Sequence, residues 1–256
     1  MDIGLAALLC AALDNPDAPL DRYVAYLDQM AQDAAALASA PEPPIEDRLA
    51  VLNEVIVRRH GFGGDTESYD DMQNADLMRV IDRRKGLPVA LGILYIQTAR
   101  ALGWDLNGLN FPGHFLLRLE ADGQRLVLDP FNGGRRMSMP EMRTLLQSMT
   151  GGAVELRPDD VQAVGSRDVL LRLQNNIKTR AVQAGDTARG IEVLQRMVLI
   201  APAYLAIWRE LAGLQAKTGN LQAAMQTLQT FIDESDDAEA RRDAAESLQI
   251  LRRKLN

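Results

Sequence analysis

Residues 88 to 102, PVALGILYIQTARAL, are nearly all apolar, and this run limits the folds that are open to the chain. It is long enough for a helix rather than a strand, and it stops at Gly103, as helices often do. We therefore expect a buried central helix. The periodicity then changes to short segments that alternate in part, with a turn at residues 121 to 123. Segments 106–111, 114–120 and 125–128 predict an antiparallel sheet of about three strands packed on this helix.

Two further helices are predicted near the start of the sequence, at residues 3 to 13 and 19 to 38, and they should pair as a hairpin. A third helix should carry Leu49, Leu52 and Ile56 and end near Gly61. The glycine-rich, acidic stretch 61–71 predicts a loop. A short helix at 74–83, closed by Gly86, is expected to follow that loop.

The pattern is helical from about Asp168 to the end, and it repeats. A shift of 34 residues aligns Gly185-Asp186 with Gly219-Asn220, and the period and helix-turn-helix pattern are typical of tetratricopeptide repeats. We expect two repeats and a final capping helix, Ala238 to Leu255. Six polar residues are predicted to line the concave face of these repeats: Asn175, Asn176, Lys178, Arg209, Gln215 and Lys217.

The size of the chain predicts how many domains it forms, and its charge limits the classes of partner it can bind. At 256 residues it exceeds the usual single domain, and we expect two, at 1–160 and 161–256. A net charge of −7 provides no global field to attract phosphates, so no nucleic-acid partner is expected. The apolar run from residue 3 to 13 is too short to span a bilayer, and Asp2 precedes it where a secretion signal would carry a basic residue.

Cysteine and histidine are scarce. Cys10 is the single cysteine, which excludes an internal disulfide and a cysteine-based zinc site and fits a reducing compartment. The two histidines lie far apart in the sequence and do not form a recognisable metal site. We therefore predict a cytoplasmic protein with no membrane partner, no cofactor and no bound metal.

Three short motifs suggest a thiol hydrolase that lacks its thiol. In cysteine-dependent acyl transfer a histidine deprotonates a thiol at a helix start, and an acidic residue orients that histidine. The chain order here is Gly86-Leu87-Pro88 at the helix start, then His114, then Asp129-Pro130. This order resembles the transglutaminase-like fold, whose core reads Gly-x-Cys, then His, then Asp-Pro. In this sequence Pro88 holds the place of the cysteine.

The segment from about Leu49 to Gly134 more closely resembles the bacterial invasion-regulator (Sir-type) family of transglutaminase-like proteins with C-terminal tetratricopeptide repeats. The positions that carry this resemblance are Asn53, Gly61-Phe62, Gly64, Tyr69, Asn74, the segment from Arg83-Arg84 to Pro88, Tyr95, Arg100, Gly103, Pro112-Gly113-His114-Phe115, Asp129-Pro130-Phe131 and Gly133-Gly134. The sequence departs from the family pattern at Ala75, Ala90 and Gly92, where relatives are expected to carry small hydroxyl residues.

The resemblance implies an α+β fold: a transglutaminase-like (papain-like) domain of helices and antiparallel sheet, followed by an all-α domain of tetratricopeptide-like repeats. It also implies a site around His114 and Asp129, which we interpret as a retained dyad without catalytic activity. The other candidate binding residues are Asn74, Arg84, Tyr95, Pro112 and Gly113. Simpler interpretations remain for the dyad, because His114 could hydrogen-bond a backbone carbonyl and Asp129-Pro130 could begin a turn.

Other nucleophiles in the sequence do not replace the thiol convincingly. Thr98 lies deep in the predicted helix, and the phenol of Tyr95 ionises only at high pH. Cys10 stands among Leu8, Leu9 and Ala11, as a small core residue would, and it could take part only if the first helix packed over the site. The sequence does not decide whether Cys10 lies near His114.

We predict a non-catalytic scaffold for protein interaction or regulation, in which the degenerate domain and the repeats form a groove for a protein or peptide. The alternative is an enzyme: a hydrolase or acyltransferase that uses His114 and Asp129 with water. A small-molecule sensor that uses the same pocket is a third possibility. The sequence fixes neither the partner nor the oligomeric state.

Overall fold

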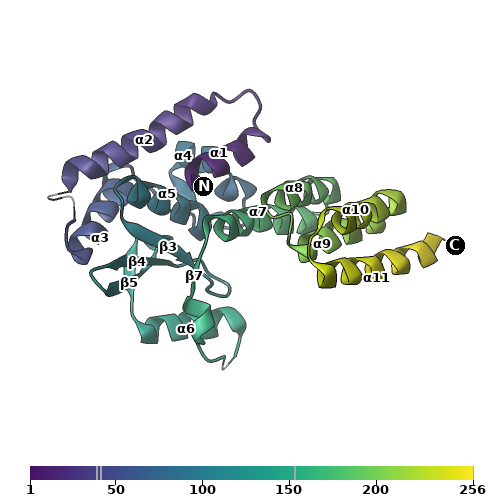
Figure 1. Cartoon of the computed structure of the whole chain (residues 1–256). Coiled ribbons are helices and arrows are strands. Elements are labelled where there is room, and N and C mark those ends of the chain that lie inside the picture. The colour runs from purple at the N-terminus through teal and green to yellow at the C-terminus, as the bar shows by residue number, and fades with distance from the viewer. Residues whose placement is uncertain (39, 41, 153, 256) are drawn as a thin grey trace. The chain divides into compact units, whose positions relative to one another are not determined.

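The computed structural model describes residues 1–38, 40, 42–152 and 154–255, and the chain divides into two compact units, Met1–Leu173 and Gln174–Asn256 (Figure 1). The domain boundary expected after residue 160 stays a prediction. Within the described residues, none of the helices combines the length and the apolar character that crossing a bilayer requires.

The first unit combines helices with a small sheet. Its helices are α1 (Ile3–Ala12), α2 (Leu20–Leu37), α3 (Ile45–Asn53), a π-helical turn (Glu54–Arg59), a 3-10 turn (Met72–Ala75), α4 (Leu77–Arg83), α5 (Pro88–Ala101), α6 (Met139–Thr150) and a second 3-10 turn (Pro158–Val161). Its strands are β1 (Gly63–Gly64), β2 (Lys85–Gly86), β3 (Asp105–Leu109), β4 (Leu117–Ala121), β5 (Gln124–Asp129), β6 (Arg135–Met137) and β7 (Ala163–Val164).

Helix α5 is the buried centre of the first unit. Pro88 occupies its first turn, where a missing backbone N–H costs nothing because no helical partner exists for it. Eleven of its residues are buried, which accounts for the nearly continuous apolar sequence. Gly103, with φ +74°, follows the helix end. The predicted central helix is therefore confirmed.

The main sheet is antiparallel throughout, with strand order β6-β5-β4-β3-β7. It has five strands rather than the expected three, because β6 and β7 contain only three and two residues and carry no alternation that a sequence could show. His114 was expected to begin a strand, and this is wrong. It lies in the connection between β3 and β4, because Gly113 turns the chain with φ +74° four residues before β4 begins at Leu117.

The two faces of the sheet pack against different helices. Leu117 lies on the α5 side, since a Cβ added to Gly92 of α5 would come within 3.5 Å of its side chain. Side chains alternate along a strand, so Arg118 points to the opposite face. Helix α6 covers that face, where Met142 and Leu146 join one apolar cluster with residues of the sheet and its connections: Leu109, Phe111, Leu116 and Met137.

The remaining helices of the first unit largely follow the sequence. Helices α1 and α2 pack together as expected, and both contact α5. The third predicted helix is split into α3 and the π-helical turn, and it ends at His60. Helix α4 was expected to close at Gly86, but Arg84 is its C-cap, in a left-handed conformation with φ 61°. The left-handed residue is therefore a charged one, which the position of the glycine did not indicate.

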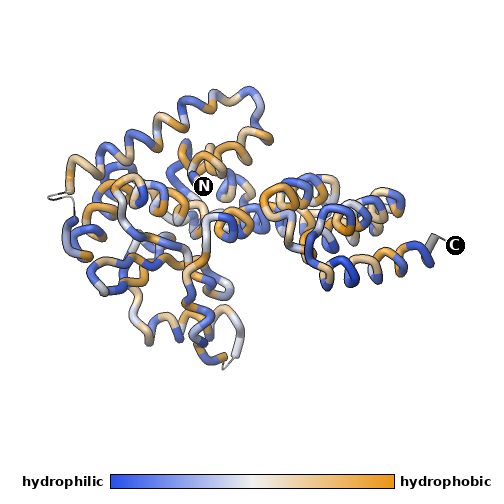
Figure 2. The backbone as a smooth tube through the Cα atoms, viewed as in Figure 1, coloured by the Kyte–Doolittle hydropathy of each residue, from blue (hydrophilic) through white to orange (hydrophobic). Residues whose placement is uncertain are grey.

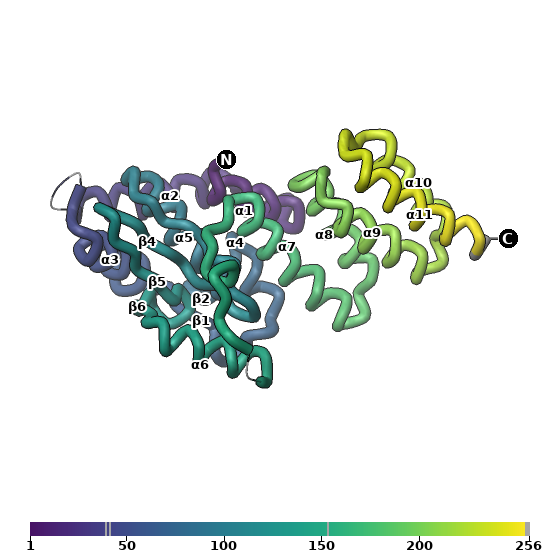
Figure 3. Tube along the Cα trace, turned by 60° about the horizontal axis from the view of Figure 1, so that its bottom comes forward, coloured from purple at the N-terminus to yellow at the C-terminus, as the bar shows by residue number. Residues whose placement is uncertain are grey.

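The second unit is entirely helical in the residues described. Helix α7 (Ser166–Gln183) begins in the first unit and continues into the second, followed by α8 (Thr187–Ile200), α9 (Leu205–Lys217), α10 (Leu221–Glu234) and α11 (Ala238–Leu255). Hydrophobic and hydrophilic stretches alternate along these helices (Figure 2), and α8 to α11 lie side by side (Figure 3).

The 34-residue shift of the sequence corresponds to repeated local geometry. Gly185 and Gly219 precede α8 and α10 with φ values of +82° and +84°. Asp186 and Asn220 then cap these helices by accepting from the backbone N–H groups of Arg189 and Ala223. Equivalent turns and caps at the same spacing define two helix-turn-helix repeats with α11 after them.

Candidate functional site

His114 and Asp129 form a buried pair in the first unit. The distance from His114 Nε2 to Asp129 Oδ1 is 3.0 Å, and the two residues are 6% and 1% exposed. Asp129 is the last residue of β5, and the β3–β4 connection brings His114 to it from fifteen residues earlier in the chain. The structure thus brings together the two residues that the sequence suggested as a dyad.

Asp129 also organises the turn that follows it. Its Oδ1 accepts from the backbone N–H of Phe131 at 3.0 Å, and its Oδ2 accepts from the Asn132 amide at 2.7 Å. Burial acts to raise the pKa of Asp129, but the hydrogen bond and charge of His114, together with these two donors, outweigh burial and hold it below its ordinary value. Asp129 is therefore an ionised acceptor that fixes both the imidazole and the turn.

The other ring nitrogen of His114, Nδ1, has no hydrogen-bond partner among the described residues. In an acid-histidine-nucleophile arrangement this is the nitrogen that faces the nucleophile or a water molecule. Pro112 and Gly113 set the direction of His114, since Gly113 adopts φ +74° and Met149 of α6 packs against its backbone. The two candidate residues thus shape the connection that carries the histidine, and their role in binding stays a prediction.

Aromatic and cationic groups surround the histidine. The ring of Phe131 meets His114 edge-on with centroids 6.3 Å apart, and it meets Tyr69 in the same way at 5.6 Å. Arg172 of α7 donates to the backbone carbonyls of His114 at 2.6 Å and Phe111 at 2.9 Å. Sequence reasoning missed Arg172, because it lies on a helix with no local pattern that would link it to a loop about sixty residues earlier.

No nucleophilic side chain stands at the start of α5. From the sequence, Pro88 is expected at the place of the thiol, and the structure shows that it is buried. The neighbouring glycines are closely packed: a Cβ on Gly86 would meet Val80 at 2.9 Å, and a Cβ on Gly92 would overlap the ring of Phe115. The chemistry that remains is that of a buried imidazole oriented by a carboxylate, which can accept or deliver a proton.

Tyr95 is connected to the dyad through a chain of hydrogen bonds. Its hydroxyl donates to Asn53 Oδ1 at 2.9 Å, and the Asn53 amide donates to the carbonyl of Gly134 at 3.1 Å. The backbone N–H of Gly134 in turn donates to the carbonyl of Asp129 at 2.9 Å. Burial, with a smaller contribution from the charge of Asp129, raises the pKa of Tyr95, so the phenol stays neutral and donates. Tyr95 is thus a positioning residue for the Asp129 turn.

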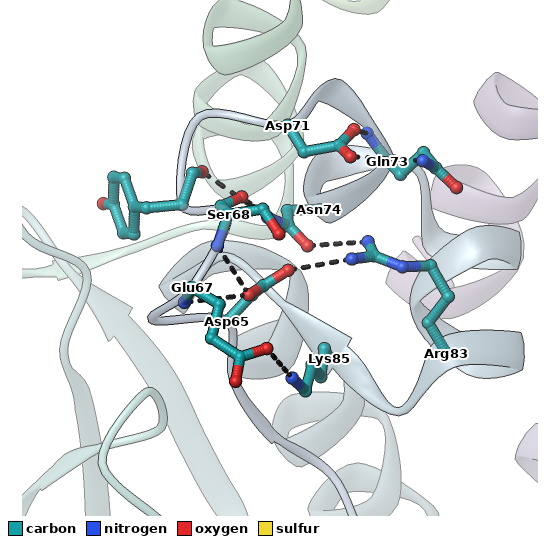
Figure 4. Close-up of polar contacts among 9 residues, drawn as sticks. Asp65, Glu67, Ser68, Asp71, Gln73, Asn74, Arg83 and Lys85 are labelled. Carbon is teal, nitrogen blue, oxygen red and sulfur yellow. Dashed lines mark hydrogen bonds and ion pairs between the residues drawn. The ribbon is translucent and has the colours of Figure 1, made fainter.

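Asn74 belongs to a separate network around the buried Asp65 (Figure 4). Its amide donates to the carbonyl of Ser68 at 2.6 Å, and its Oδ1 accepts from Arg83, which also pairs with Asp65 at 2.8 Å. The Asn74 carbonyl accepts from the N–H of Leu87, directly before α5. Its side chain thus joins the loop 65–71 to α4, and its backbone carbonyl holds the segment before α5.

Arg84 lies in a third cluster. Its guanidinium stacks over the rings of Tyr26 and Phe62 at 4.5 and 5.0 Å and donates to the Tyr26 hydroxyl. That hydroxyl also meets His60 Nδ1 at 2.5 Å, and His60 Nε2 meets Asp33 at 2.8 Å. These contacts therefore place Arg84 beside α2 and the segment that follows the π-helical turn, and none of them joins it to His114.

Cys10 is half-buried on α1, a helix that packs against α2, α4 and α5. The part of the chain that the structure describes contains no group of three or more histidine, cysteine, aspartate or glutamate residues that could hold a metal ion. The site is therefore built from one histidine, one aspartate and their aromatic, arginine and backbone neighbours.

Comparison with known sequences agrees with this fold. The family model described as the transglutaminase-like superfamily matches residues 21–175, and a tetratricopeptide repeat model matches residues 177–249. The chain belongs to the transglutaminase-like superfamily, and its domain of that type is followed by tetratricopeptide repeats. Both features were predicted from the sequence and are confirmed.

The chain is similar to several bacterial UPF0162 proteins. It is 31% identical to one from Xylella fastidiosa over 77% of this chain and 70% of the relative, and 30% identical to one from Pseudomonas aeruginosa over 91% and 84%. It is also 29% identical to F-box only protein 21 of Mus musculus, over 54% of this chain and 22% of that protein. The narrower Sir-type assignment stays a prediction.

Proposed function

We propose that this protein is a non-catalytic interaction scaffold, in which the transglutaminase-like domain has lost its nucleophile and the helical repeats bind a protein or peptide. One observation carries the proposal: the buried first residue of α5, at the place of the thiol, is Pro88, whose ring has no nucleophilic atom. The same proposal assigns a regulatory role in the cytoplasm.

The geometry of the dyad supports a structural role. Asp129 accepts from His114, Phe131 and Asn132, so its oxygens are already used in holding the turn after β5. The side chain of His114 is only 6% exposed, so little of its imidazole ring is accessible to a substrate. These contacts give both residues a role in stabilising the fold that does not depend on catalysis.

The repeat unit supplies the interaction surface in this proposal. Tetratricopeptide repeats generally mediate protein–protein contacts, and here charged residues join alternate helices: Lys178 of α7 pairs with Glu210 of α9 at 2.5 Å, and Arg209 of α9 donates to the Asp243 carbonyl of α11 at 2.9 Å. Gln215, expected on this face, is buried and accepts from Thr227 of α10. Exposed charges on α9 and α11 are the groups available to a partner.

Covalent trapping tests the loss of catalysis. The purified chain is incubated with activated acyl esters and with glutamine-containing peptides, and the intact mass and the released product are followed for the wild type and His114→Ala. We expect no acyl adduct and the same background release from both proteins. Turnover that disappears in a folded His114→Ala variant would refute the scaffold proposal.

Partner binding is tested on the repeat surface. Cross-linking in native extract, followed by mass spectrometry, should give a discrete partner for the wild type, and Arg209→Glu should lose it. Arg58→Glu is the matched control, because Arg58 is a 77% exposed arginine in the first unit and also has a carboxylate partner. Equal partner recovery from both variants would contradict binding at the α9–α11 surface.

The competing function is a hydrolase in which His114 acts as a general base on water. It is favoured by one observation, namely that Asp129 holds Nε2 while Nδ1 has no partner in the described residues. That enzyme would show a His114-dependent release of product without any covalent adduct. The trapping experiment separates it from the scaffold, since it predicts turnover and the scaffold predicts none.

A further inference from the structure

A pocket lies on the face of the sheet that carries α6, away from the contacts of His114. Its volume is about 370 Å³, within the range of about 300–1,000 Å³ typical of small-ligand sites. Ten residues line it, among them Arg118, Arg125, Arg136, Val127, Met137 and Met139. Three of the ten are arginines and none is acidic, although the whole chain has 35 acidic and 28 basic residues.

The strand register explains how this lining is assembled. Arg118 of β4 is paired with Val127 of β5, and Val127 is paired with Met137 of β6, so the three residues form one row across the sheet. Side chains in such a row point to the same face. Glu120 and Arg125 form the next row on that face. Helix α6 begins two residues after the last residue of β6 and adds Met139 and Met142.

The charged end of the pocket has an excess of one positive charge. Glu120 binds Arg118 at 2.6 Å and Arg125 at 3.0 Å, so one carboxylate lies between two guanidinium groups. Burial acts to raise the pKa of Glu120, but the two arginines outweigh it and keep the pKa below its ordinary value, so Glu120 is charged. Two arginines and one carboxylate therefore leave a net charge of +1. The third lining arginine, Arg136, is balanced by Glu46 at 2.8 Å.

The two arginines differ in how far their side chains are exposed and in how many of their nitrogens are hydrogen-bonded. Arg118 is 19% exposed on its side chain and is also fixed by the carbonyl of Val161 at 3.1 Å. Arg125 is 67% exposed and uses its Nε on Glu120, and its two terminal nitrogens have no hydrogen-bond partner within the described chain. Those nitrogens are the donors that an incoming anion would meet, and an exposed ion pair such as this one is held only weakly.

The apolar end of the pocket is rich in methionine. Met137 and Met142 are 5% and 2% exposed and belong to the cluster beneath α6, whereas Met139 is 47% exposed. Methionine side chains are flexible and polarisable, so they adapt to an aliphatic chain laid over them. An exposed methionine beside buried ones also provides apolar area that a ligand would remove from water.

We propose that this pocket binds a small aliphatic carboxylate. The carboxylate lies on Arg125 and the edge of Arg118, and the hydrocarbon chain lies over Val127, Met137 and Met139. The single net positive charge matches a monoanion better than a phosphate dianion, and the apolar floor requires a hydrocarbon body, which inorganic anions lack. This site and the His114 pair use different residues, so each can be tested without the other.

Octanoate is the probe, and methionine methyl resonances of the full-length chain in an NMR titration are the readout. Octanoate is expected to shift the resonances of Met137 and Met139 in a saturable way, whereas acetate lacks the chain and octan-1-ol lacks the charge, so each should bind at least about tenfold more weakly. Arg125→Gln should weaken octanoate binding by about tenfold, the loss expected for one charge-assisted hydrogen bond.

Arg58→Gln is the matched control, because Arg58 is 77% exposed and pairs with Glu54 at 2.8 Å, much as Arg125 pairs with Glu120. Binding that is unchanged in Arg58→Gln and reduced in Arg125→Gln supports the proposal. Met139→Gln, at an exposed position, should also weaken octanoate while leaving the fold intact. The proposal is overturned if octanoate gives no saturable shift, if octan-1-ol binds as tightly, or if Arg125→Gln binds like the wild type.

Discussion

The hydroxyl of Tyr95 and the side chain of Asn53 lie 2.9 Å apart and join the central helix α5 to the end of α3. Gly134 packs directly against both groups, and its φ is +67°. The backbone of Gly134 then reaches Asp129 through a hydrogen bond of 2.9 Å. The close approach at this glycine is therefore what allows α3 and α5 to position the Asp129 turn.

Gly134→Ala is expected to destabilise the protein by about 3 kcal/mol, because its Cβ would overlap Asn53 and Tyr95 and its backbone would be left-handed. Gly133→Ala is the matched control, since its φ is +70° but its Cβ would meet only Val57, at 4.0 Å. We expect about 1 kcal/mol there, from the backbone alone. Urea unfolding measures both, and equal losses would contradict the packing argument.

Much of the fold could be predicted because its elements have strong local signals. The apolar run of α5 and the 34-residue spacing of Gly185 and Gly219 each depend on a pattern within a short window. Strands β6 and β7 have no such pattern, since they form only because β5 and β3 offer partners. The left-handed cap at Arg84 was missed for a similar reason, because tertiary contacts with Tyr26 and Phe62 hold it there.

The site was predictable only in part. The chain order identified His114 and Asp129, and the structure pairs them at 3.0 Å. Asn74 was expected to bind a ligand, yet its side chain is buried and its hydrogen bonds go to Ser68 and Arg83. A sequence shows that a polar residue is present, but whether its hydrogen-bonding groups are already used depends on residues brought in by the fold.

Asp65 is expected to contribute strongly to stability. It is 1% exposed, pairs with Arg83 at 2.8 Å and accepts from the backbone N–H of Ser68 at 3.0 Å. Asp65→Ala would leave these donors without an acceptor, at a cost of about 3 kcal/mol. Thermal and urea unfolding measure this loss. Glu67→Gln is the control, since Glu67 is 80% exposed and should show no measurable change; a loss as large as that of Asp65→Ala would contradict the argument.

Stability should fall in acid through Asp129. Its folded-state pKa lies below the unfolded value of about 3.9, so its contribution is complete above that value and is lost as the pH falls through the folded pKa. Asp129→Asn places an amide against the Asn132 amide and should cost about 2 kcal/mol at neutral pH. The difference from the wild type in urea unfolding curves should shrink as the pH falls below the unfolded-state pKa. A difference that is constant with pH would show that the charge of Asp129 has no role.

The two repeats should respond alike when their helix caps are removed. Asp186 accepts from the N–H of Arg189 at 3.0 Å, and Asn220 accepts from that of Ala223 at the same distance. Replacing either by alanine leaves a first-turn N–H without its acceptor and should cost about 1 kcal/mol in each case. Asp237, which accepts from Glu239 at 2.9 Å, provides a third cap at the start of α11 for comparison.

These losses should also add, because Asp186 and Asn220 begin different helices and share no hydrogen-bond partner. The double variant is therefore expected to lose about 2 kcal/mol in urea unfolding. Thr187→Ala is the control for a change at the same helix end that leaves the Asp186 cap in place. A double loss far from the sum of the single losses would mean that the two caps do not act as independent, equivalent ends of two repeats.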